Sequence, residues 1–321
     1  MDKSVASQEV HFGMSTVMTH SAFGKHAKES LQEVRREAVR LEEMLSRFIP
    51  ESEISKVNRS AGVKSERLSE ETYEILSSAI KFSRFSRGIF DITIGPLVDL
   101  WKSNQSALKP PEDSHIREVL SLVNYHDLLL DPEKRSAGLR RVGQSLDLGG
   151  IGKGFAGDKF LQIFKKYGIS SAYTNIGGNV MALGKKPDGS FWRIGIQHPR
   201  EEKSLIGLVS VEDKAVVTSG DYQRYFLGST GKRYHHILDP ATGYPAESGL
   251  VSVTVVADSS TTADVLSTIV FVAGREKGLE LLRGFRGTEA ILVELDLQIY
   301  ITTGLEKYFQ AREGIRVNVF N

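Results

Sequence analysis

Between residues 171 and 257 the chain alternates short apolar runs with glycine, aspartate and proline, and this pattern constrains the fold more than any other feature. The runs are SAYTNIGG, NVMALG, FWRIGIQ, LIGLVSV, AVVTSG, YQRYFL and GLVSVTVVA. Strands of this length, joined by tight turns, are typical of antiparallel sheet. We therefore expect this part of the chain to form mostly antiparallel sheet.

Two amphipathic helices are expected in the first hundred residues. One is marked by apolar residues at alternating spacings of three and four, and Pro50 is expected to stop it. Its apolar positions are Leu31, Val34, Ala38, Leu41, Leu45 and Phe48. The second covers residues 69–86, with Ser69 as its N-cap and an ending at Ser86-Arg87-Gly88.

The remaining elements complete an α+β pattern. We expect a strand interrupted by glycine over residues 9–19, two short strands within 126–148, and a helix from Gly152 to Gly168. Helices over 262–272 and up to about 284 precede strands near 289–302. The predicted fold class is α+β, with mixed, mostly antiparallel sheets and flanking helices in two intertwined lobes. No linker or repeat separates parts of the 321-residue chain, so residues 1–321 are expected to form a single domain.

Composition excludes several classes of function. Lys and Arg number 41 against 40 Asp and Glu, and the basic residues are scattered, so no nucleic-acid partner is expected. The absence of cysteine excludes thiol catalysis, disulfides, iron–sulfur clusters, thiolate zinc sites and a lipid-modified cysteine. No apolar run is long enough for a membrane span or a secretory signal. We therefore expect a cytoplasmic protein, with a trimmed exported protein as the alternative.

The first stretch suited to bind a ligand is Asp147–Gly154, where a strand runs into a glycine-rich turn and then a helix. Glycines let the main chain approach a ligand closely, and a helix N-terminus offers unpaired N–H groups to a phosphate. Lys153 adds positive charge, and Asp147 is placed to fix a ribose or a base. The stretch matches neither a P-loop nor a full dinucleotide fingerprint, so a plain tight turn is the alternative.

Two other stretches carry polar groups suited to chemistry. In Asp264-Val265-Leu266-Ser267-Thr268, the four-residue spacing puts the Asp264 carboxylate and the Thr268 hydroxyl on one helix face. Such oxygen ligands suit Mg²⁺, but helix capping is the alternative. In the His235-His236 pair, neighbouring side chains of a strand point to opposite faces, so at most one faces a given site. A neutral imidazole there is suited to accept a proton, and a purely structural role is the alternative.

Taken together, eight stretches in the same order resemble the FAD:protein FMN transferase family, often called ApbE-like. The stretches are Gly13-Met14-Ser15-Thr16, Ser46-Arg47-Phe48 followed by Pro50–Ser55 and Asn58, FDITIGPLVDLW, DLGGIGKGFAGD, NIGGN, TSGDY, HHILDPATG and ADVLST. Two positions depart from the family pattern: Ser15 stands where glycine is frequent, and Phe48 where tyrosine is frequent. In this family the Phe48 position is thought to influence whether FAD is transferred or only hydrolysed.

The resemblance implies a set of site residues. A Mg²⁺ ion would be bound by the main-chain carbonyl of Gly150, the Asp264 carboxylate and the Thr268 hydroxyl, with Ser267 as a further contributor. FAD would lie in the cleft between the lobes. It would be contacted by Met14, Phe48, Ile89, Phe90, Asp91, Asp147, Lys153, His236 and Ile237.

The resemblance also implies a reaction. With Mg²⁺ neutralising the FAD pyrophosphate, a Thr or Ser hydroxyl of an acceptor flavoprotein would attack the FMN-side phosphorus and release AMP. His236 is the leading candidate base, and Asp264 serves catalysis through the metal. Two alternatives stay open. One is a Mg²⁺-dependent FAD pyrophosphatase, in which water replaces the protein hydroxyl, and the other is a flavin-binding carrier without turnover.

Overall fold

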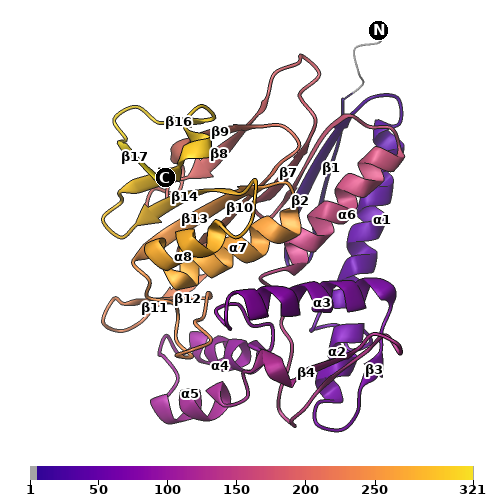
Figure 1. Cartoon of the computed structure of the whole chain (residues 1–321), viewed down its shortest axis with the longest axis vertical. Helices are drawn as coiled ribbons and strands as arrows, with labels where there is room; N and C mark the ends of the chain where they lie inside the picture. Colours follow the sequence, from indigo (N-terminus) through magenta and orange to yellow (C-terminus); the bar gives the residue numbers. More distant parts are fainter. Residues whose placement is uncertain (1–5, 321) are drawn as a thin grey trace. The chain divides into compact units, whose positions relative to one another are not determined.

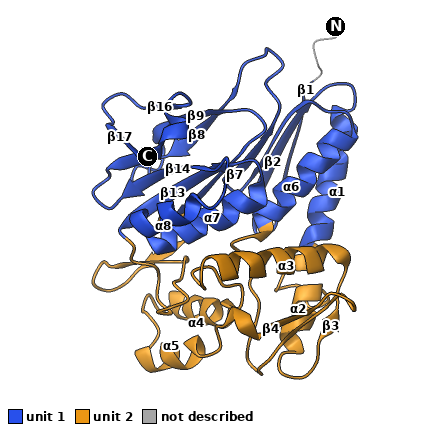
Figure 2. Cartoon of the chain, viewed as in Figure 1, with its two compact units in different colours: residues 1–42, 153–220, 249–321 blue, residues 43–152, 221–248 orange. Residues whose placement is uncertain are grey.

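The computed structural model describes residues 6–320 of the chain. Their contacts divide them into two compact units, each built from separate segments of the chain (Figure 2). Unit 1 contains the described residues up to Glu42, Lys153–Gly220 and those from Gly249 onward, and unit 2 contains Glu43–Gly152 and Asp221–Ser248. The chain therefore passes between the units repeatedly, while the assignment of residues 1–321 to a single domain stays a prediction.

A large sheet forms the centre of unit 1 (Figure 1). Among the described residues it has nine strands in the order β1-β2-β6-β7-β10-β13-β14-β15-β17. All of its neighbouring pairs are antiparallel except β15 and β17, which are parallel. The expectation of mostly antiparallel sheet is confirmed. The strands are β1 (Ala6–Gly13), β2 (Thr16–Phe23), β6 (Ser171–Ile176), β7 (Asn179–Leu183), β10 (Ala215–Gly220), β13 (Leu250–Ala257), β14 (Glu289–Glu294), β15 (Ile299–Thr302) and β17 (Val317–Phe320).

A second sheet and several helices cover this central sheet. The second sheet has the order β16-β9-β8, from strands β8 (Trp192–Gln197), β9 (Leu205–Val211) and β16 (Phe309–Ala311). Its residues Trp192, Ile206 and Val209 share one apolar core with Val216 and Val256 of the central sheet. The helices of unit 1 are most of α1 (Ala27–Leu45), α6 (Gly152–Lys166), α7 (Ser260–Ala273) and α8 (Arg275–Leu282), and the 3₁₀ turn η2 (Thr303–Leu305) follows β15. Helix α7 packs on strands β10 and β13 of the central sheet.

The segment 9–19 is a hairpin and not one interrupted strand. Strands β1 and β2 pair along their whole length, from Ala6 opposite Phe23 to Gly13 opposite Thr16. The two residues between them, Met14 and Ser15, have φ values of 49° and 60°. Two consecutive left-handed residues form the tight turn whose twist suits an antiparallel pair, and this chain makes it without glycine at either position.

Helix α1 ends earlier than its apolar periodicity predicts. Leu41 and Leu45 are buried as expected, but the helix stops at Leu45, before Pro50, and the Phe48 side chain is 61% exposed. The carbonyl of Ser46 accepts hydrogen bonds from the hydroxyls of Ser52 and Ser55 at the start of the next helix. The Ser46 carbonyl therefore accepts from these hydroxyls and not from an amide of a further helical turn. The apolar periodicity, which includes Phe48, thus extends about one turn beyond the end of the helix.

Unit 2 combines helices with two small sheets, and Figure 2 shows it in orange. Its apolar core joins Leu97, Trp101 and Ile116 to Phe226 and Leu238. The strands pair as β3-β5-β4 and β11-β12. The elements are α2 (Glu53–Arg59), β3 (Glu66–Arg67), α3 (Glu70–Phe85), α4 (Gly95–Gln105), α5 (Asp113–Leu120), η1 (Tyr125–Asp127), β4 (Leu128–Asp131), β5 (Ser136–Leu139), β11 (Tyr225–Leu227) and β12 (Arg233–His235).

Several local predictions are confirmed in detail. Ser69 caps α3 by accepting from the Thr72 amide, and α3 ends where Ser86-Arg87-Gly88 was expected to end it. Helices α6 and α7 lie within two residues of their expected bounds at the N-terminal end. Helices α2 and α5 and strands β3, β12, β16 and β17 were not predicted. Within residues 6–320, no helix is both long and apolar enough to cross a membrane.

A buried histidine of unit 1 couples stability to pH. His20 of β2 is fully buried, its Nδ1 lies 2.7 Å from the Thr174 hydroxyl, and its ring contacts Phe160 edge-on. Burial lowers the pKa of His20 from 6.5 to about 3, and the neighbouring His11 adds to the effect. The folded chain therefore keeps His20 neutral where the unfolded chain binds a proton.

We expect the free energy of unfolding to fall as the pH drops below about 6.5, because protonation of His20 favours the unfolded chain. The difference in pKa corresponds to a loss of about 2 kcal/mol by about pH 5. Urea denaturation at neutral and acidic pH measures this loss. The variant His20→Gln should flatten the pH dependence, and His26→Gln, at an exposed position, should not. An equal loss in wild type and His20→Gln would contradict the assignment.

Candidate functional site

The Asp264 carboxylate is buried inside unit 1 and does not cap its own helix. Helix α7 is capped by Ser259, whose hydroxyl accepts from the Thr262 amide. Asp264 follows one turn later, is only 4% exposed, and accepts a hydrogen bond at Oδ2 from the Gly154 amide at 2.8 Å. Asp264 therefore does not cap its own helix, but its carboxylate accepts from an orphan amide in the first turn of α6 and so joins α7 to α6.

The first turn of α6 is shaped to receive this carboxylate. A Cβ atom on Gly154 would lie 2.5 Å from the Ser260 carbonyl oxygen and 2.7 Å from the Asp264 Cβ. Only glycine allows the two helices to come this close. Lys153 places its Nζ 3.9 Å from Asp264 Oδ1, on the oxygen that the Gly154 amide does not contact. The helix start and Lys153 together surround the carboxylate with positive potential.

A second carboxylate fixes the same pair of helices. Asp158 of α6 accepts from the main-chain amides of Ser260 and Thr261, at 2.7 and 2.9 Å. It also accepts from the hydroxyls of Ser259 and Thr261. Asp158 thus satisfies the orphan amides at the N-terminus of α7 from a neighbouring helix. The position of Asp264 follows from this clamp.

Three hydroxyl groups, those of Ser219, Ser267 and Thr268, lie near the main-chain carbonyl of Asp264. Ser267 is fully buried, donates to the Asp264 carbonyl at 2.8 Å and lies 2.8 Å from the Ser219 hydroxyl on β10. Thr268 is partly buried, and its hydroxyl lies 3.4 Å from both the Asp264 carbonyl and the Ser219 hydroxyl. Because its contacts are long, the Thr268 hydroxyl can reorient toward a ligand at little cost, whereas two short contacts hold the Ser267 hydroxyl in place.

The hairpin turn at Met14 lies beside the turn formed by Gly177 and Gly178 in unit 1. The Gly177 amide donates to the Val17 carbonyl, and a Cβ on Gly177 would lie against the Thr16 side chain. Gly177 and Gly178, from the NIGGN motif, both have positive φ. Two of the motifs quoted from the sequence, far apart along the chain, therefore meet at the Met14 turn.

In unit 2 the glycine-rich loop is fastened by its neighbours. Asp147 accepts from the Gly149 amide at Oδ1, at 2.7 Å, and its own amide donates to the Ile92 carbonyl. The Asn58 side chain makes two hydrogen bonds with the main chain of Leu146, one to its amide and one to its carbonyl. The motifs that contain Asn58, Ile92 and Asp147 are thus brought together, and the loop that carries the Gly150 carbonyl is held at its first half.

Phe48 offers an exposed aromatic ring in unit 2. Lys102 Nζ lies 4.6 Å from the ring centroid, and the guanidinium carbon of Arg47 lies 5.6 Å from it. An exposed ring flanked by two cations is suited to stack on another flat group that carries negative charge nearby.

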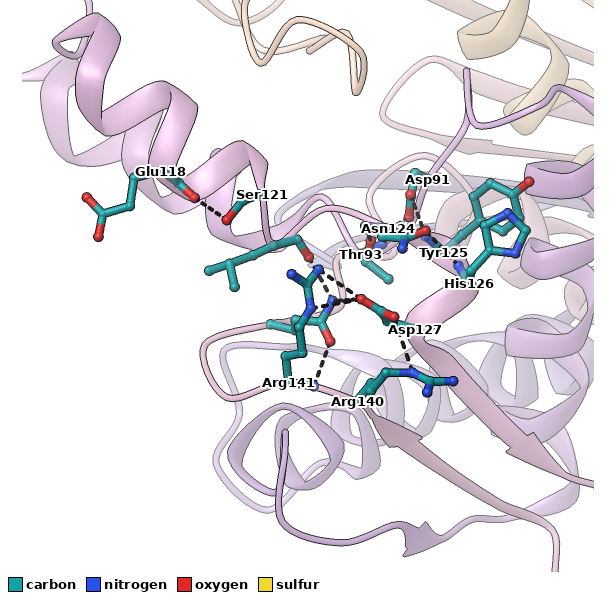
Figure 3. Close-up of polar contacts among 12 residues, drawn as sticks. Asp91, Thr93, Glu118, Ser121, Asn124, Tyr125, His126, Asp127, Arg140 and Arg141 are labelled. Carbon is teal, nitrogen blue, oxygen red and sulfur yellow. Dashed lines mark hydrogen bonds and ion pairs between the residues drawn. The ribbon is translucent and has the colours of Figure 1, made fainter.

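Asp91 uses its carboxylate inside unit 2 (Figure 3). Oδ1 accepts from the amide and the hydroxyl of Thr93, and Oδ2 accepts from the Tyr125 amide. Burial raises the pKa of Asp91, and the hydrogen bonds from Thr93 and Tyr125 oppose that rise. Asp91 thereby fixes the segment that carries Ile89, which is half-buried, and Phe90, which is buried.

The two neighbouring histidines differ in burial, as expected, although only His235 lies in a strand, and His236 follows the end of β12. His235 is buried, and its Nε2 donates to the Ala246 carbonyl, while burial lowers its pKa. His236 is exposed, and its Nδ1 lies 3.2 Å from the Arg224 carbonyl. A carbonyl only accepts, so Nδ1 carries the hydrogen and Nε2 is the basic nitrogen of the neutral ring. The next residue, Ile237, is buried.

The structure thus gathers the predicted residues in two places. Unit 1 brings Lys153, Asp264, Ser267 and Thr268 together, and holds Met14 at a separate turn. Unit 2 holds Phe48, Ile89–Asp91, Asp147, Gly150, His236 and Ile237. Within residues 6–320 there is no cluster of three or more His, Cys, Asp or Glu side chains of the kind that holds a metal by itself. One carboxylate with hydroxyl and carbonyl oxygens nevertheless suits Mg²⁺, which takes few protein ligands and keeps water and phosphate oxygens.

Sequence reasoning missed three supporting residues, Asp158, Ser219 and Asn58. Each lies in a motif that the sequence displays, but none was given a role. Asp158 stands four residues after Gly154, one helical turn away on the same face, and this spacing is a signal that periodicity could have used. No spacing along the chain points to the Ser219–Ser267 contact, because 48 residues separate the two.

Comparison with known proteins gives one consistent result. The model of the ApbE family matches residues 14–292 of the chain. The chain is 35% identical to an FAD:protein FMN transferase of Klebsiella pneumoniae over 265 residues, which cover 82% of each chain. It is 34% identical to an FAD:protein FMN transferase of Treponema pallidum over 292 residues, 86% of this chain and 80% of the relative.

Solved structures agree with these relatives. The chain is similar to the ApbE protein of Thermotoga maritima with a TM-score of 0.87 and 31% identity, covering 96% of this chain and all of that one. It is similar to the apo form of the flavinyl transferase ApbE of Pseudomonas stutzeri with a TM-score of 0.83 and 31% identity, covering 96% and 98%.

The contact between α6 and α7 makes a prediction of unusual sign. Glycine to alanine within a helix ordinarily stabilises a protein, but Gly154→Ala should lower the free energy of unfolding by about 1–3 kcal/mol, because the added methyl group meets Ser260 and Asp264. Gln162→Ala, at an exposed position of the same helix, should change it by less than about 0.5 kcal/mol. Denaturant unfolding measures both, and a Gly154→Ala protein as stable as wild type would show that the helices do not pack this closely.

Proposed function

Because the chain belongs to the ApbE family, whose curated relatives are named FAD:protein FMN transferases, we propose that it is a Mg²⁺-dependent enzyme that transfers FMN from FAD to a Thr or Ser of an acceptor flavoprotein. That the chain is a flavin transferase follows from its membership and from the named activity of those relatives. The dependence on Mg²⁺, the attachment to a hydroxyl and the release of AMP are the proposed part.

The residues around Asp264 support a Mg²⁺ site. We propose as ligands the Asp264 carboxylate, the Thr268 hydroxyl and the main-chain carbonyl of Gly150. Asp264 supplies the charge and is almost fully buried, with Oδ2 occupied by an amide. Ser267 supports the site by holding the Asp264 carbonyl rather than by binding the metal. When bound, Mg²⁺ would neutralise negative charge on the pyrophosphate of FAD.

The chain's own groups have separate tasks toward FAD. Lys153, at the first turn of α6, is placed to offer positive charge to a phosphate. Phe48 presents an exposed ring suited to stack on a flat ring of the substrate. Met14, Ile89, Phe90 and Ile237 are proposed to provide apolar contacts, and Asp91 to position the segment before it.

His236 is the proposed general base. Its Nδ1 is committed to the Arg224 carbonyl, so in the neutral ring Nε2 can accept a proton from a Thr or Ser hydroxyl. In the proposed reaction that hydroxyl oxygen forms a bond to the FMN-side phosphorus while the bond from this phosphorus to the bridging pyrophosphate oxygen breaks. The acceptor proton goes to His236, and AMP leaves with the bridging oxygen.

The single observation that carries the proposal is the buried Asp264 carboxylate, held by the Gly154 amide beside Lys153, on the residue whose main-chain carbonyl lies 3.4 Å from the Thr268 hydroxyl. A carrier that only binds flavin has no need for a hard-cation site, so this observation favours an enzyme. It does not distinguish transfer from hydrolysis, since both use the same groups. Phe48, where tyrosine is frequent in the family, leaves a Mg²⁺-dependent FAD pyrophosphatase as the second candidate.

The function is tested by incubating the protein with FAD, Mg²⁺ and a Thr-containing acceptor protein, and following AMP together with the mass of the acceptor. Asp264→Asn should lower the rate of AMP release at least about 100-fold, because it removes the charged ligand. Asp258→Asn makes the same change at an exposed carboxylate near the start of α7 and should leave the rate unchanged. AMP with free FMN and unmodified acceptor would favour the hydrolase. FAD binding without AMP would favour the carrier.

His236→Asn tests the proposed base separately. Asparagine can still donate to the Arg224 carbonyl but has no basic nitrogen, so the rate of FMN transfer should fall by about 10²–10⁴-fold while FAD binding persists. His126→Asn, at another exposed histidine of unit 2, serves as the control. Full activity in His236→Asn would show that another group takes the proton.

A further inference from the structure

Arg47 lies between two carboxylates of unit 2, those of Asp147 and of the largely exposed Asp99. The Arg47 side chain is only 9% exposed. Nη1 donates to Asp147 Oδ2 at 2.9 Å and to the Gly95 carbonyl at 3.3 Å, and Nη2 donates to Asp99 Oδ2 at 2.5 Å. A buried guanidinium with this many acceptors is held in one orientation, because its planar fork has fixed donor directions.

Asp147 connects this arginine to the glycine-rich loop. One of its oxygens, Oδ2, accepts from Arg47, and the other, Oδ1, accepts from the Gly149 amide two residues along. The amide of Asp147 itself donates to the Ile92 carbonyl. Each oxygen of the carboxylate therefore accepts a hydrogen bond from a group of unit 2, an arrangement that orients the main chain.

We propose that Arg47 is a positioning residue that fixes the main chain of Gly149 and Gly150 through Asp147. This inference rests on the proposed function, in which the Gly150 carbonyl is a ligand of Mg²⁺. A glycine-rich loop has many accessible conformations. The hydrogen bond from the Gly149 amide to the Asp147 carboxylate restricts them only if the carboxylate keeps its orientation. Arg47 supplies that orientation, and Asp99 fixes Arg47 from its other side.

An ordinary buried ion pair, which only stabilises unit 2, would give different results from a positioning residue. Loss of either kind of arginine lowers overall stability, because a carboxylate is left without its partner. Only the loss of a positioning residue should also loosen the loop in the folded protein and weaken metal binding. A suitable control is Arg141 of the same unit, which lies 2.8 Å from Asp127 (Figure 3). Among residues 6–320 the structure records no contact between Arg141 and Asp147.

The test is hydrogen–deuterium exchange of the peptide that contains Gly149 and Gly150, without FAD or metal. Under native conditions, Arg47→Gln should exchange about tenfold faster there than wild type, and Arg141→Gln should match wild type. Arg47→Lys keeps one cation and should give an intermediate rate, and it carries the test if Arg47→Gln does not fold. Faster unfolding overall with an unchanged exchange rate in this peptide would overturn the proposal.

Metal dependence provides the second readout. The Mg²⁺ concentration for half-maximal AMP release should rise about tenfold in Arg47→Gln, with a smaller change in the rate at saturating Mg²⁺. An unchanged half-saturating concentration would also overturn the proposal. Failure of the proposed function is distinguishable, because it appears in wild type as absence of transfer, whereas the exchange measurement reports on the loop whether or not FMN is transferred.

Discussion

The hydrogen bond from the Gly154 amide to the Asp264 carboxylate is the contact on which the chemistry of unit 1 depends. It buries a charged group at the junction of two helices, and burial of a carboxylate is costly unless amides and cations surround it. Gly154 permits the close approach, Lys153 supplies positive charge, and Asp158 holds the start of α7 in place.

Both units use hydrogen bonds to orient groups, but they orient different kinds of group. Unit 1 orients a carboxylate and a hydroxyl on one helix face, using neighbouring helices and strand β10. Unit 2 orients main chain, using the side chains of Asn58, Asp91 and Asp147 to hold irregular segments between short helices. Asp91 uses its carboxylate there to accept hydrogen bonds from two amides and a hydroxyl. These hydrogen bonds offset the cost of burying Asp91, for which the structure records no ion pair within residues 6–320.

The sequence predicted the elements whose signals are local. Ser69 at the start of α3 and the long apolar stripes of α1 and α6 needed only neighbouring residues to be recognised. Phe48 extended the stripe of α1 too far, because the Ser46 carbonyl is taken by hydroxyls that the pattern does not contain. Three-residue strands such as β12 are too short to show periodicity. In the site, helical spacing placed Asp264 and Thr268 on one face, but the partner of Asp264 lies 110 residues away and only the fold brings it close.

The most direct measurement is diffraction from crystals grown with FAD and Mn²⁺ in place of Mg²⁺, with the metal located by its anomalous signal. The account predicts a single strong peak within bonding distance of an Asp264 carboxylate oxygen and of the Thr268 hydroxyl, absent in Asp264→Asn crystals prepared identically. A peak bound elsewhere on the chain, or bound FAD with no metal at Asp264, would contradict it.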